Sequence, residues 1–321
     1  MNYSNDVSPC CEANDAFERG LAQLESGDLD EAQREFDTAV DFQPQFPRAV
    51  CGRGVVWLRR GEYGKALAEF EAAISLDGKY ARARFHRGQV ALIQGRFIDA
   101  IQDFDRAIEL EPAFTPYYLA RGHASLNSGD SDRAVADVSH VIRADPRSAT
   151  AHLYLGIAHA YRSEPQDSLC ELEEALRCEP GLAAAHLWTA IVHMDLEEYE
   201  KSVASLDRAV ELGDTSAEVL HRRAMAKHCS GRLREAVRDY SETLRTAGVD
   251  AQVYYHRGLA YAELSEYLDA ISDYTKALEL LPQFCDAYYA RSIAWEKLGQ
   301  LDRATDDLNQ CLAISRTQAE P

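Results

Sequence analysis

Small and bulky apolar residues recur along this chain with a constant spacing of 34 residues. Within each 34-residue unit, apolar residues follow the i, i+3 and i+4 spacing of an amphipathic helix, as at Phe104, Ala107 and Ile108. Two such patterns occur in each unit, so each unit predicts two helices joined by a turn. The small residues that mark the period are Gly20, Gly54, Gly88, Gly122, Gly156, Ala190, Ala224, Gly258 and Ser292.

Glycine and proline mark the predicted helix ends. Gly61, Gly95 and Gly129 lie between the two helices of their units, where glycine supplies the left-handed backbone that ends a helix. Ser163 and Glu197 stand near the turns of the fifth and sixth units, so these turns are predicted to be strained or altered. Prolines that end the second helix of their units are Pro44, Pro112, Pro146, Pro180 and Pro282.

The repeated residues predict how the helices pack. A small residue at the crossing of two helices lets the backbones approach, and a bulky residue 16 positions later fills the space beside the crossing. One such hairpin cannot bury both of its faces, so neighbouring hairpins must stack. The sequence therefore predicts an all-α solenoid. The bulky positions are Phe36, Phe70, Phe104, Val138, Leu172, Leu206, Tyr240, Tyr274 and Leu308.

The repeat resembles that of the tetratricopeptide repeat (TPR) family, and the third unit carries the resemblance in its segments 87–88 and 95–100 and in Phe104, Ala107 and Pro112. Nine units of 34 residues occupy residues 13–318, which leaves a polar N-terminal tail at 1–12 and a C-terminal tail at 319–321. The resemblance implies a right-handed superhelical solenoid in which the first helix of each unit lines a concave groove.

Charge and composition narrow the function. The chain has 34 Lys and Arg against 53 Asp and Glu, a net charge of -19, which disfavours nucleic acid as a partner. It has no long apolar run that would span a membrane, and its first residues lack the features of a signal peptide. We therefore expect a soluble, cytoplasmic protein whose eight cysteines are reduced thiols.

No catalytic or metal-binding motif is present in the sequence. It lacks HExxH, GxxxxGK[ST], GxSxG and GxGxxG. The pairs His152 with His159 and His186 with His193 lie seven residues apart, but they occupy positions that are aromatic core sites in the TPR family. We expect them to pack rather than to bind a metal. The chain is thus predicted to be no enzyme and to need no cofactor or metal.

These observations predict a non-catalytic scaffold that binds a partner peptide or helix in the groove. The alternatives are a structural solenoid that associates with itself and an accessory subunit that positions an enzyme. The asparagines with which some TPR proteins grip a C-terminal carboxylate are absent from the equivalent positions of this chain.

Two groove surfaces are candidates for the partner site. The first is a local basic stretch in units two and three, suited to a partner with acidic and apolar residues, unless its arginines pair with acidic neighbours. It consists of Arg48, Arg59, Arg82, His86, Phe85, Val55 and Leu58. The second is an apolar strip in units four to six, unless neighbouring helices cover it. It consists of Leu119, Leu153, Ile157, Leu187 and Ile191.

Overall fold

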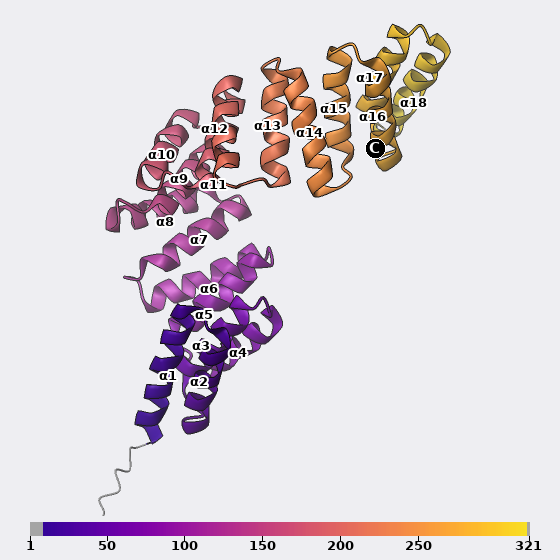
Figure 1. Ribbon diagram of the computed structural model, residues 1–321. Coiled ribbons are helices and arrows are strands. Elements are labelled where there is room, and N and C mark those ends of the chain that lie inside the picture. The colour runs from indigo at the N-terminus through magenta and orange to yellow at the C-terminus, as the bar shows by residue number, and fades with distance from the viewer. Residues whose placement is uncertain (1–8, 320–321) are drawn as a thin grey trace, which may run out of the picture. The chain divides into compact units, whose positions relative to one another are not determined.

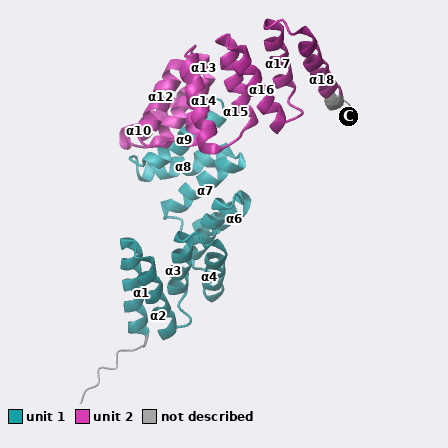
Figure 2. Ribbon diagram, turned by 45° about the vertical axis from the view of Figure 1, so that its right-hand side comes forward, with its two compact units in different colours: residues 1–164 teal, residues 165–321 magenta. Residues whose placement is uncertain are grey.

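The computed structural model describes residues 9–319, with side chains for 10–316 (Figure 1). Every regular element in this part of the chain is an α-helix, and eighteen helices follow one another as successive hairpins. This confirms the predicted all-α solenoid class. The helices form two compact units, residues 1–164 and 165–321, which are shown in different colours in Figure 2.

The first unit contains nine helices. In each of its hairpins, the first helix packs against the second, and the second packs against the first helix of the following hairpin. The bounds are α1 Pro9–Ser26, α2 Leu29–Phe42, α3 Pro47–Arg59, α4 Tyr63–Leu76, α5 Ala81–Ile93, α6 Phe97–Leu110, α7 Thr115–Ser128, α8 Ser131–Ala144 and α9 Ala149–Tyr161.

The second unit contains the remaining nine helices and repeats the same packing. The bounds are α10 Pro165–Cys178, α11 Ala183–Asp195, α12 Tyr199–Glu211, α13 Ala217–Cys229, α14 Leu233–Ala247, α15 Ala251–Glu263, α16 Tyr267–Leu280, α17 Cys285–Lys297 and α18 Leu301–Ala319. The extent of the repeat array, 13–318, stays a prediction; α1 already begins within the predicted N-terminal tail.

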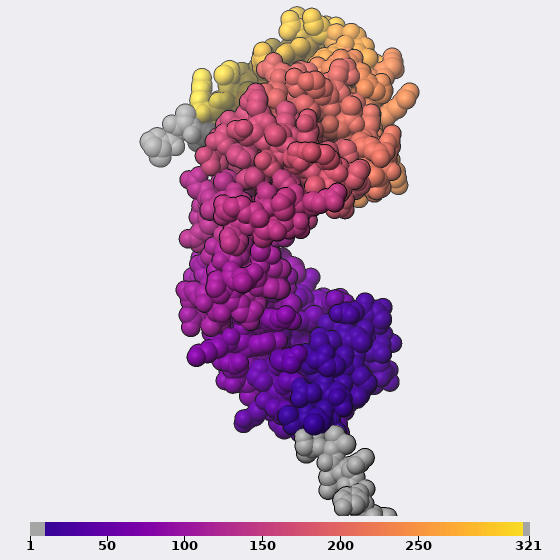
Figure 3. Space-filling view, turned by 90° about the vertical axis from the view of Figure 1, so that its left-hand side faces the viewer, coloured from indigo at the N-terminus to yellow at the C-terminus, as the bar shows by residue number. Residues whose placement is uncertain are grey.

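The helix crossings marked by glycine have the predicted pairing of a small and a bulky residue, whereas Leu308 of the ninth repeat is 40% exposed rather than buried. Phe70 is fully buried, and its ring lies so close to Gly54 that a Cβ atom on Gly54 would be 2.5 Å from the ring atom Cε1. A Cβ atom on Gly88 would likewise be 2.6 Å from Cε1 of Phe104. In the space-filling view, the atoms of the first unit form a continuous surface from its indigo end to its magenta end (Figure 3). Only glycine, which has no side chain, allows the rings of Phe70 and Phe104 to approach the helix backbone this closely.

The turns inside the hairpins are also as predicted. Gly61, Gly95 and Gly129 have positive φ angles of 76°, 72° and 85°. Ser163 and Glu197 adopt the same left-handed backbone, with φ angles of 60° and 59°, which confirms that these two turns carry a conformation unfavourable for a residue with a side chain. Ser265, with φ 63°, is a third residue of this kind that the sequence analysis did not single out.

A row of arginines joins the two helices of each of the first four hairpins, and two of its members also link their hairpin to the preceding one; the predicted pattern of apolar and small residues does not include it. Arg53 of α3 donates to Glu69 of α4 at 2.7 Å and to Asp37 of α2 at 3.1 Å, so it links its own hairpin to the preceding one. Arg121 of α7 pairs in the same way with Asp137 of α8 and with Asp105 of α6. The arginines of this row are Arg19, Arg53, Arg87 and Arg121.

The second unit has a row of the same kind. Arg223 of α13 bridges Asp239 at 2.7 Å and Asp207 at 3.0 Å, and Arg257 and Arg291 each hold an aspartate 16 residues later. Leu155 and Thr189 occupy the equivalent positions in the intervening repeats, so the arginine row is interrupted there.

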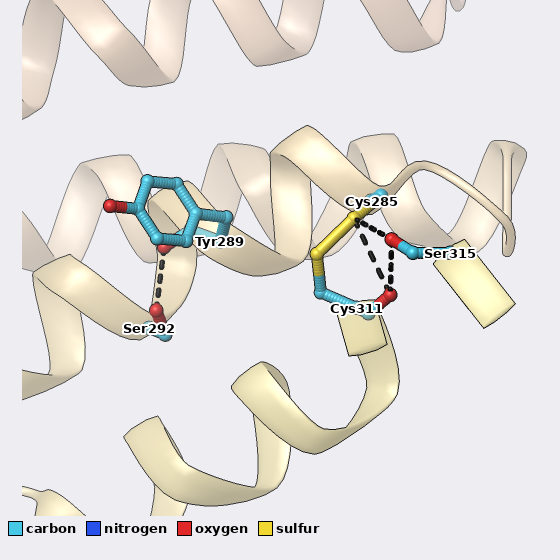
Figure 4. The surroundings of a disulfide bond; sticks show 5 residues. All are labelled: Cys285, Tyr289, Ser292, Cys311 and Ser315. Carbon is cyan, nitrogen blue, oxygen red and sulfur yellow. Dashed lines mark hydrogen bonds between the residues drawn. A yellow bond between two sulfur atoms is a disulfide. The ribbon is translucent and has the colours of Figure 1, made fainter. Parts of the chain in front are cut away.

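A disulfide bond joins Cys285 to Cys311, which corrects the prediction that all eight cysteines are reduced thiols (Figure 4). Cys285 opens α17 and Cys311 lies in α18, and their Cα atoms are 4.6 Å apart because these two helices pack together. Their separation of 26 residues matches no common cysteine motif. The hydroxyl of Ser315 lies 3.5 Å from the sulfur of Cys285.

Candidate functional site

The first helices of the first three hairpins enclose a cavity of about 510 Å³ in the first unit. We call it the arginine cavity. Arginines and apolar side chains share its walls, and Glu25 is its one acidic residue. The lining residues are Phe17, Leu21, Leu24 and Glu25 of α1, Arg48, Cys51, Gly52, Val55 and Arg59 of α3, Tyr80 just before α5, and Arg82 and His86 of α5.

The three arginines of the cavity are poorly compensated by acidic neighbours. Arg48 lies 4.4 Å above the ring of Phe17, and its only carboxylate among the described residues is the half-exposed Glu18, at 3.4 Å. Arg59 donates to the backbone carbonyl of Leu24. Arg82 is exposed and lies 5.8 Å from the centroid of the Phe114 ring, with no carboxylate within ion-pair distance in the described part of the chain. Their positive charge is therefore available to a ligand.

The wall beside Arg82 is formed by groups that burial keeps uncharged. Burial raises the pKa of the Tyr80 hydroxyl and raises the pKa of the Cys51 thiol to about 12. Burial also lowers the pKa of His86, whose Nδ1 is 2.8 Å from the side-chain oxygen of Gln89. Tyr80 thus keeps its hydroxyl proton, beside the thiol of Cys51, and His86 is neutral at pH 7.

The structure brings together five of the seven residues of the predicted basic surface. Arg48, Val55, Arg59, Arg82 and His86 all line the arginine cavity.

The other two residues of that surface belong to the packed interior instead. The ring of Phe85 packs between those of Phe104 and Tyr117, at centroid distances of 5.8 and 5.1 Å. Leu58 packs against the buried cluster around Phe70. Binding by any member of the predicted surface stays a prediction.

The predicted apolar strip offers less surface. Leu153 and Ile157 are buried, at 5% and 8% exposure, and Leu119 is half-buried against the cluster around Val138. Leu187 and Ile191, in the second unit, are also half-buried. Because its central members are covered, this strip has weaker support as a partner site than the arginine cavity.

The second unit contains a cavity of about 380 Å³ beside α13 and α15. Glu218, His221, Met225 and Asp250 are among its lining residues. The Nε2 atom of His221 is 3.3 Å from Nδ1 of His256 on the next hairpin. Arg222 of this cavity is already paired with Glu218 at 3.0 Å, so the cavity has no unpaired cationic group comparable to Arg82.

The contact between His221 and His256 predicts a pH-dependent stability. Burial, together with the charges of His221 and His228, lowers the pKa of His256 to about 4. In the unfolded chain, His256 has its ordinary pKa near 6.5. Between about pH 6.5 and pH 4 the unfolded chain therefore binds more protons than the folded chain, and stability falls as the pH falls through this range. We expect a loss of about 1 to 2 kcal/mol between about pH 7 and 5, after allowing for solvent screening.

The measurement is urea unfolding of the wild type and the His256→Phe variant at both pH values. The phenylalanine does not titrate, so the variant should lose less stability than the wild type when the pH is lowered. Equal losses in the two proteins would show that His256 is not the responsible group.

The histidine pairs noted in the sequence have local partners. His152 is buried, and its Nε2 lies 3.1 Å from the carbonyl of Pro146. His159 and His193 each contact a glutamate five residues later, Glu164 at 2.6 Å and Glu198 at 2.7 Å. These contacts fix the ends of α9 and α11 and agree with a packing role; the absence of a metal requirement stays a prediction.

Among the helices of residues 9–319, none combines the length and the apolar character needed to cross a membrane.

Comparisons with known proteins bear on the family. A family model described as tetratricopeptide repeat matches residues 17–81, 58–114, 119–183 and 157–217, and a second model of the same description matches 251–284. A comparison with curated proteins gave no match.

Solved structures resemble the chain in fold. A tetratricopeptide repeat protein from Parabacteroides merdae ATCC 43184 has a TM-score of 0.61 and 15% identity, covering 78% of this chain and 98% of its own. MamA from Desulfovibrio magneticus RS-1, residues 41 to the end, has a TM-score of 0.52 and 19% identity, covering 54% and 97%. A monomeric mutant of IFIT1, solved with Gppp-AAAA, has a TM-score of 0.59 and 14% identity, covering 92% and 79%.

These structural likenesses concern the fold alone. The matched repeat segments, however, cover more than half of the sequence, and they coincide with the helical hairpins described above. The chain therefore belongs to the tetratricopeptide repeat family.

Proposed function

We propose that this protein is a non-catalytic scaffold that captures a segment of a partner protein in the arginine cavity, and that this segment combines acidic with apolar side chains. The observation that carries the proposal is the composition of the cavity: Arg48, Arg59 and Arg82 face a single lining carboxylate, that of Glu25. Protein or peptide binding is the usual role of such repeat arrays.

Acidic groups suit the cavity because guanidinium groups bind carboxylates through paired, charge-assisted hydrogen bonds. Arg82 has no carboxylate partner in the described part of the chain, and Arg48 would give up only a long contact with an exposed glutamate. Binding an anion here therefore replaces little that stabilises the free protein.

Apolar groups suit the same cavity because the half-buried Leu21 and Val55 supply part of its wall. Burying an apolar side chain against them would provide affinity, and the arginines would fix its orientation and raise the association rate. The overall charge of -19 opposes an acidic partner at long range, so the local positive charge of the cavity is needed for capture.

The test is fluorescence anisotropy with short labelled peptides in which Glu alternates with Leu or Phe. Arg48→Ala combined with Arg82→Ala should weaken binding about tenfold or more and reduce its dependence on salt. Both side chains are exposed, so the melting temperature should stay nearly unchanged.

The matched control removes two arginines elsewhere in the first unit. Arg34 and Arg96 are exposed and lie outside the arginine cavity. Arg34→Ala combined with Arg96→Ala makes the same change in net charge and should leave peptide binding almost intact. Equal binding by wild type and by the Arg48 and Arg82 variant at low salt would refute the proposal.

Self-association is a second candidate function, which the last helix favours. Leu301, Leu308 and Leu312 lie along one face of α18 and are 63%, 40% and 54% exposed. An exposed apolar face of this kind can pack against a second copy. Sedimentation at increasing protein concentration should then show a dimer that Leu308→Glu combined with Leu312→Glu abolishes.

A cytoplasmic location is a further part of the proposal, but its support is reduced. The expectation rests on the lack of a long apolar run and of signal-peptide features, whereas a disulfide such as Cys285–Cys311 is typical of oxidising compartments. Thiol labelling of the protein taken directly from cells would show whether this pair is oxidised where the protein works.

A further inference from the structure

We infer that the anionic group taken up by the arginine cavity is the phosphate of a phosphorylated side chain on the partner. This inference rests on the proposed function, and it names the chemistry of the ligand rather than a particular partner. Three features of the cavity carry it: its excess of positive charge, the position of its donors and its size.

The charge of the cavity exceeds what one carboxylate can neutralise. Three arginines line it against Glu25, and the lining histidine, His86, is neutral at pH 7. Glu18 contacts Arg48 at 3.4 Å but does not line the cavity. A carboxylate carries one negative charge, whereas a phosphate monoester carries about 1.5 to 2 at neutral pH. The phosphate is therefore the better match in charge.

The donors share one cavity. Arg48, Tyr80 and Arg82 all line it, with Arg48 over the ring of Phe17 and Arg82 over the ring of Phe114. The positive charges of both arginines also oppose the rise that burial causes in the pKa of Tyr80. Arg82 acts in the same direction on the pKa of Cys51. A phosphate has three acceptor oxygens, which two guanidinium groups and the Tyr80 hydroxyl can satisfy together.

The size and lining of the cavity suit a side chain rather than a free ion. About 510 Å³ is much more space than a phosphate group alone requires. The half-buried Leu21 and Val55 would contact the carbon atoms that carry the phosphate. Arg59, held by the carbonyl of Leu24, limits the cavity at the ends of α1 and α3.

The experiment compares labelled peptides that are identical except at one position, which holds phosphoserine, phosphotyrosine, Glu or Ser. We expect a phosphorylated peptide to bind about tenfold more tightly than the Glu peptide. The phosphoserine and phosphotyrosine arms show which side chain the cavity accepts. Arg82→Gln should remove this preference, and a melting curve like that of the wild type would show that the exposed Arg82 is not needed for folding.

The pH provides a second readout. The second ionisation of a phosphate monoester has a pKa near 6, whereas a Glu side chain stays charged well below that pH. Binding of the phosphorylated peptide should therefore weaken between about pH 7 and 5, while binding of the Glu peptide should change little. Loss of both in parallel would contradict recognition of the phosphate.

The outcomes separate this inference from the proposed function. If the Glu peptide binds as tightly as the phosphorylated peptides, the inference is wrong and the proposed function stands. If no peptide binds, both are wrong. The inference is also overturned if inorganic phosphate alone binds as tightly as the peptides, or if an RNA oligonucleotide with a terminal triphosphate binds more tightly than they do.

Discussion

Replacing Arg121 by Met should lower the unfolding free energy of the first unit by about 3 to 5 kcal/mol. Arg121 bridges Asp137 and Asp105, and the Asp137 side chain is only 4% exposed. Removing the guanidinium leaves this carboxylate buried without its ionic partner, and an unpaired buried charge costs more than the ion pair contributes. The effect is therefore much larger than that of an ordinary surface pair.

Tryptophan fluorescence during urea unfolding measures this effect. Trp57 lies in the first unit, so a background in which Trp188 and Trp295 are replaced by Phe reports on that unit alone. Arg133, which is 43% exposed and contacts Asp105 at 3.7 Å, provides the control. Arg133→Met should cost less than about 1 kcal/mol.

A double variant tests the cause. Asp137→Leu in addition to Arg121→Met removes the buried charge together with its partner, so it should recover much of the lost stability. If Arg121→Met costs no more than Arg133→Met, the arginine row contributes little to the cohesion of the hairpins.

The helix crossings could be predicted because each depends on two residues, one small and one bulky, that recur at a fixed separation in every repeat. A small residue at Gly20, Gly54 or Gly258 predicts a bulky ring 16 residues later, and the structure places those rings where a Cβ atom would be. The offset follows from the lengths of two helices and their turn, which are local properties of the chain. Local patterns of this kind are visible in the sequence.

The arginine cavity could be predicted only in part. The family's helix positions placed Arg48, Arg82 and His86 on the concave side, and all three line the cavity. Phe85 precedes His86 by one residue, yet its ring packs against the ring of Tyr117 on the next hairpin and not toward the cavity. Helical periodicity gives the face of a residue, but the size of side chains on neighbouring helices decides which residues stay accessible.

The arginine row and the disulfide show two different limits. The row has a signal in the sequence, because an Asp or Glu follows each of its arginines after 16 residues, as at Arg87 and Asp103. A search confined to apolar and small positions overlooks it. The disulfide has no such signal, since Cys285 and Cys311 meet only through the packing of α17 on α18.

The close packing at the helix crossings leads to the second large stability effect, at Gly54. A Cβ atom there would lie 2.5 and 2.8 Å from two ring atoms of Phe70 and 3.1 Å from Cβ of Glu69. Phe70 is fully buried, so its ring has no free space into which it could move. Gly54→Ala should therefore destabilise the first unit by about 1 to 3 kcal/mol, although alanine favours a helix by nearly 1 kcal/mol over glycine.

Gly64 provides a control with the opposite expected sign. It lies in α4, where a Cβ atom would meet nothing within 4 Å. Gly64→Ala should therefore stabilise the first unit by up to about 1 kcal/mol, since only the helix propensity changes. Urea unfolding followed at Trp57 measures both variants. A Gly54→Ala protein as stable as Gly64→Ala would mean that α3 and α4 do not cross at Gly54, and the period of small residues would lose its explanation.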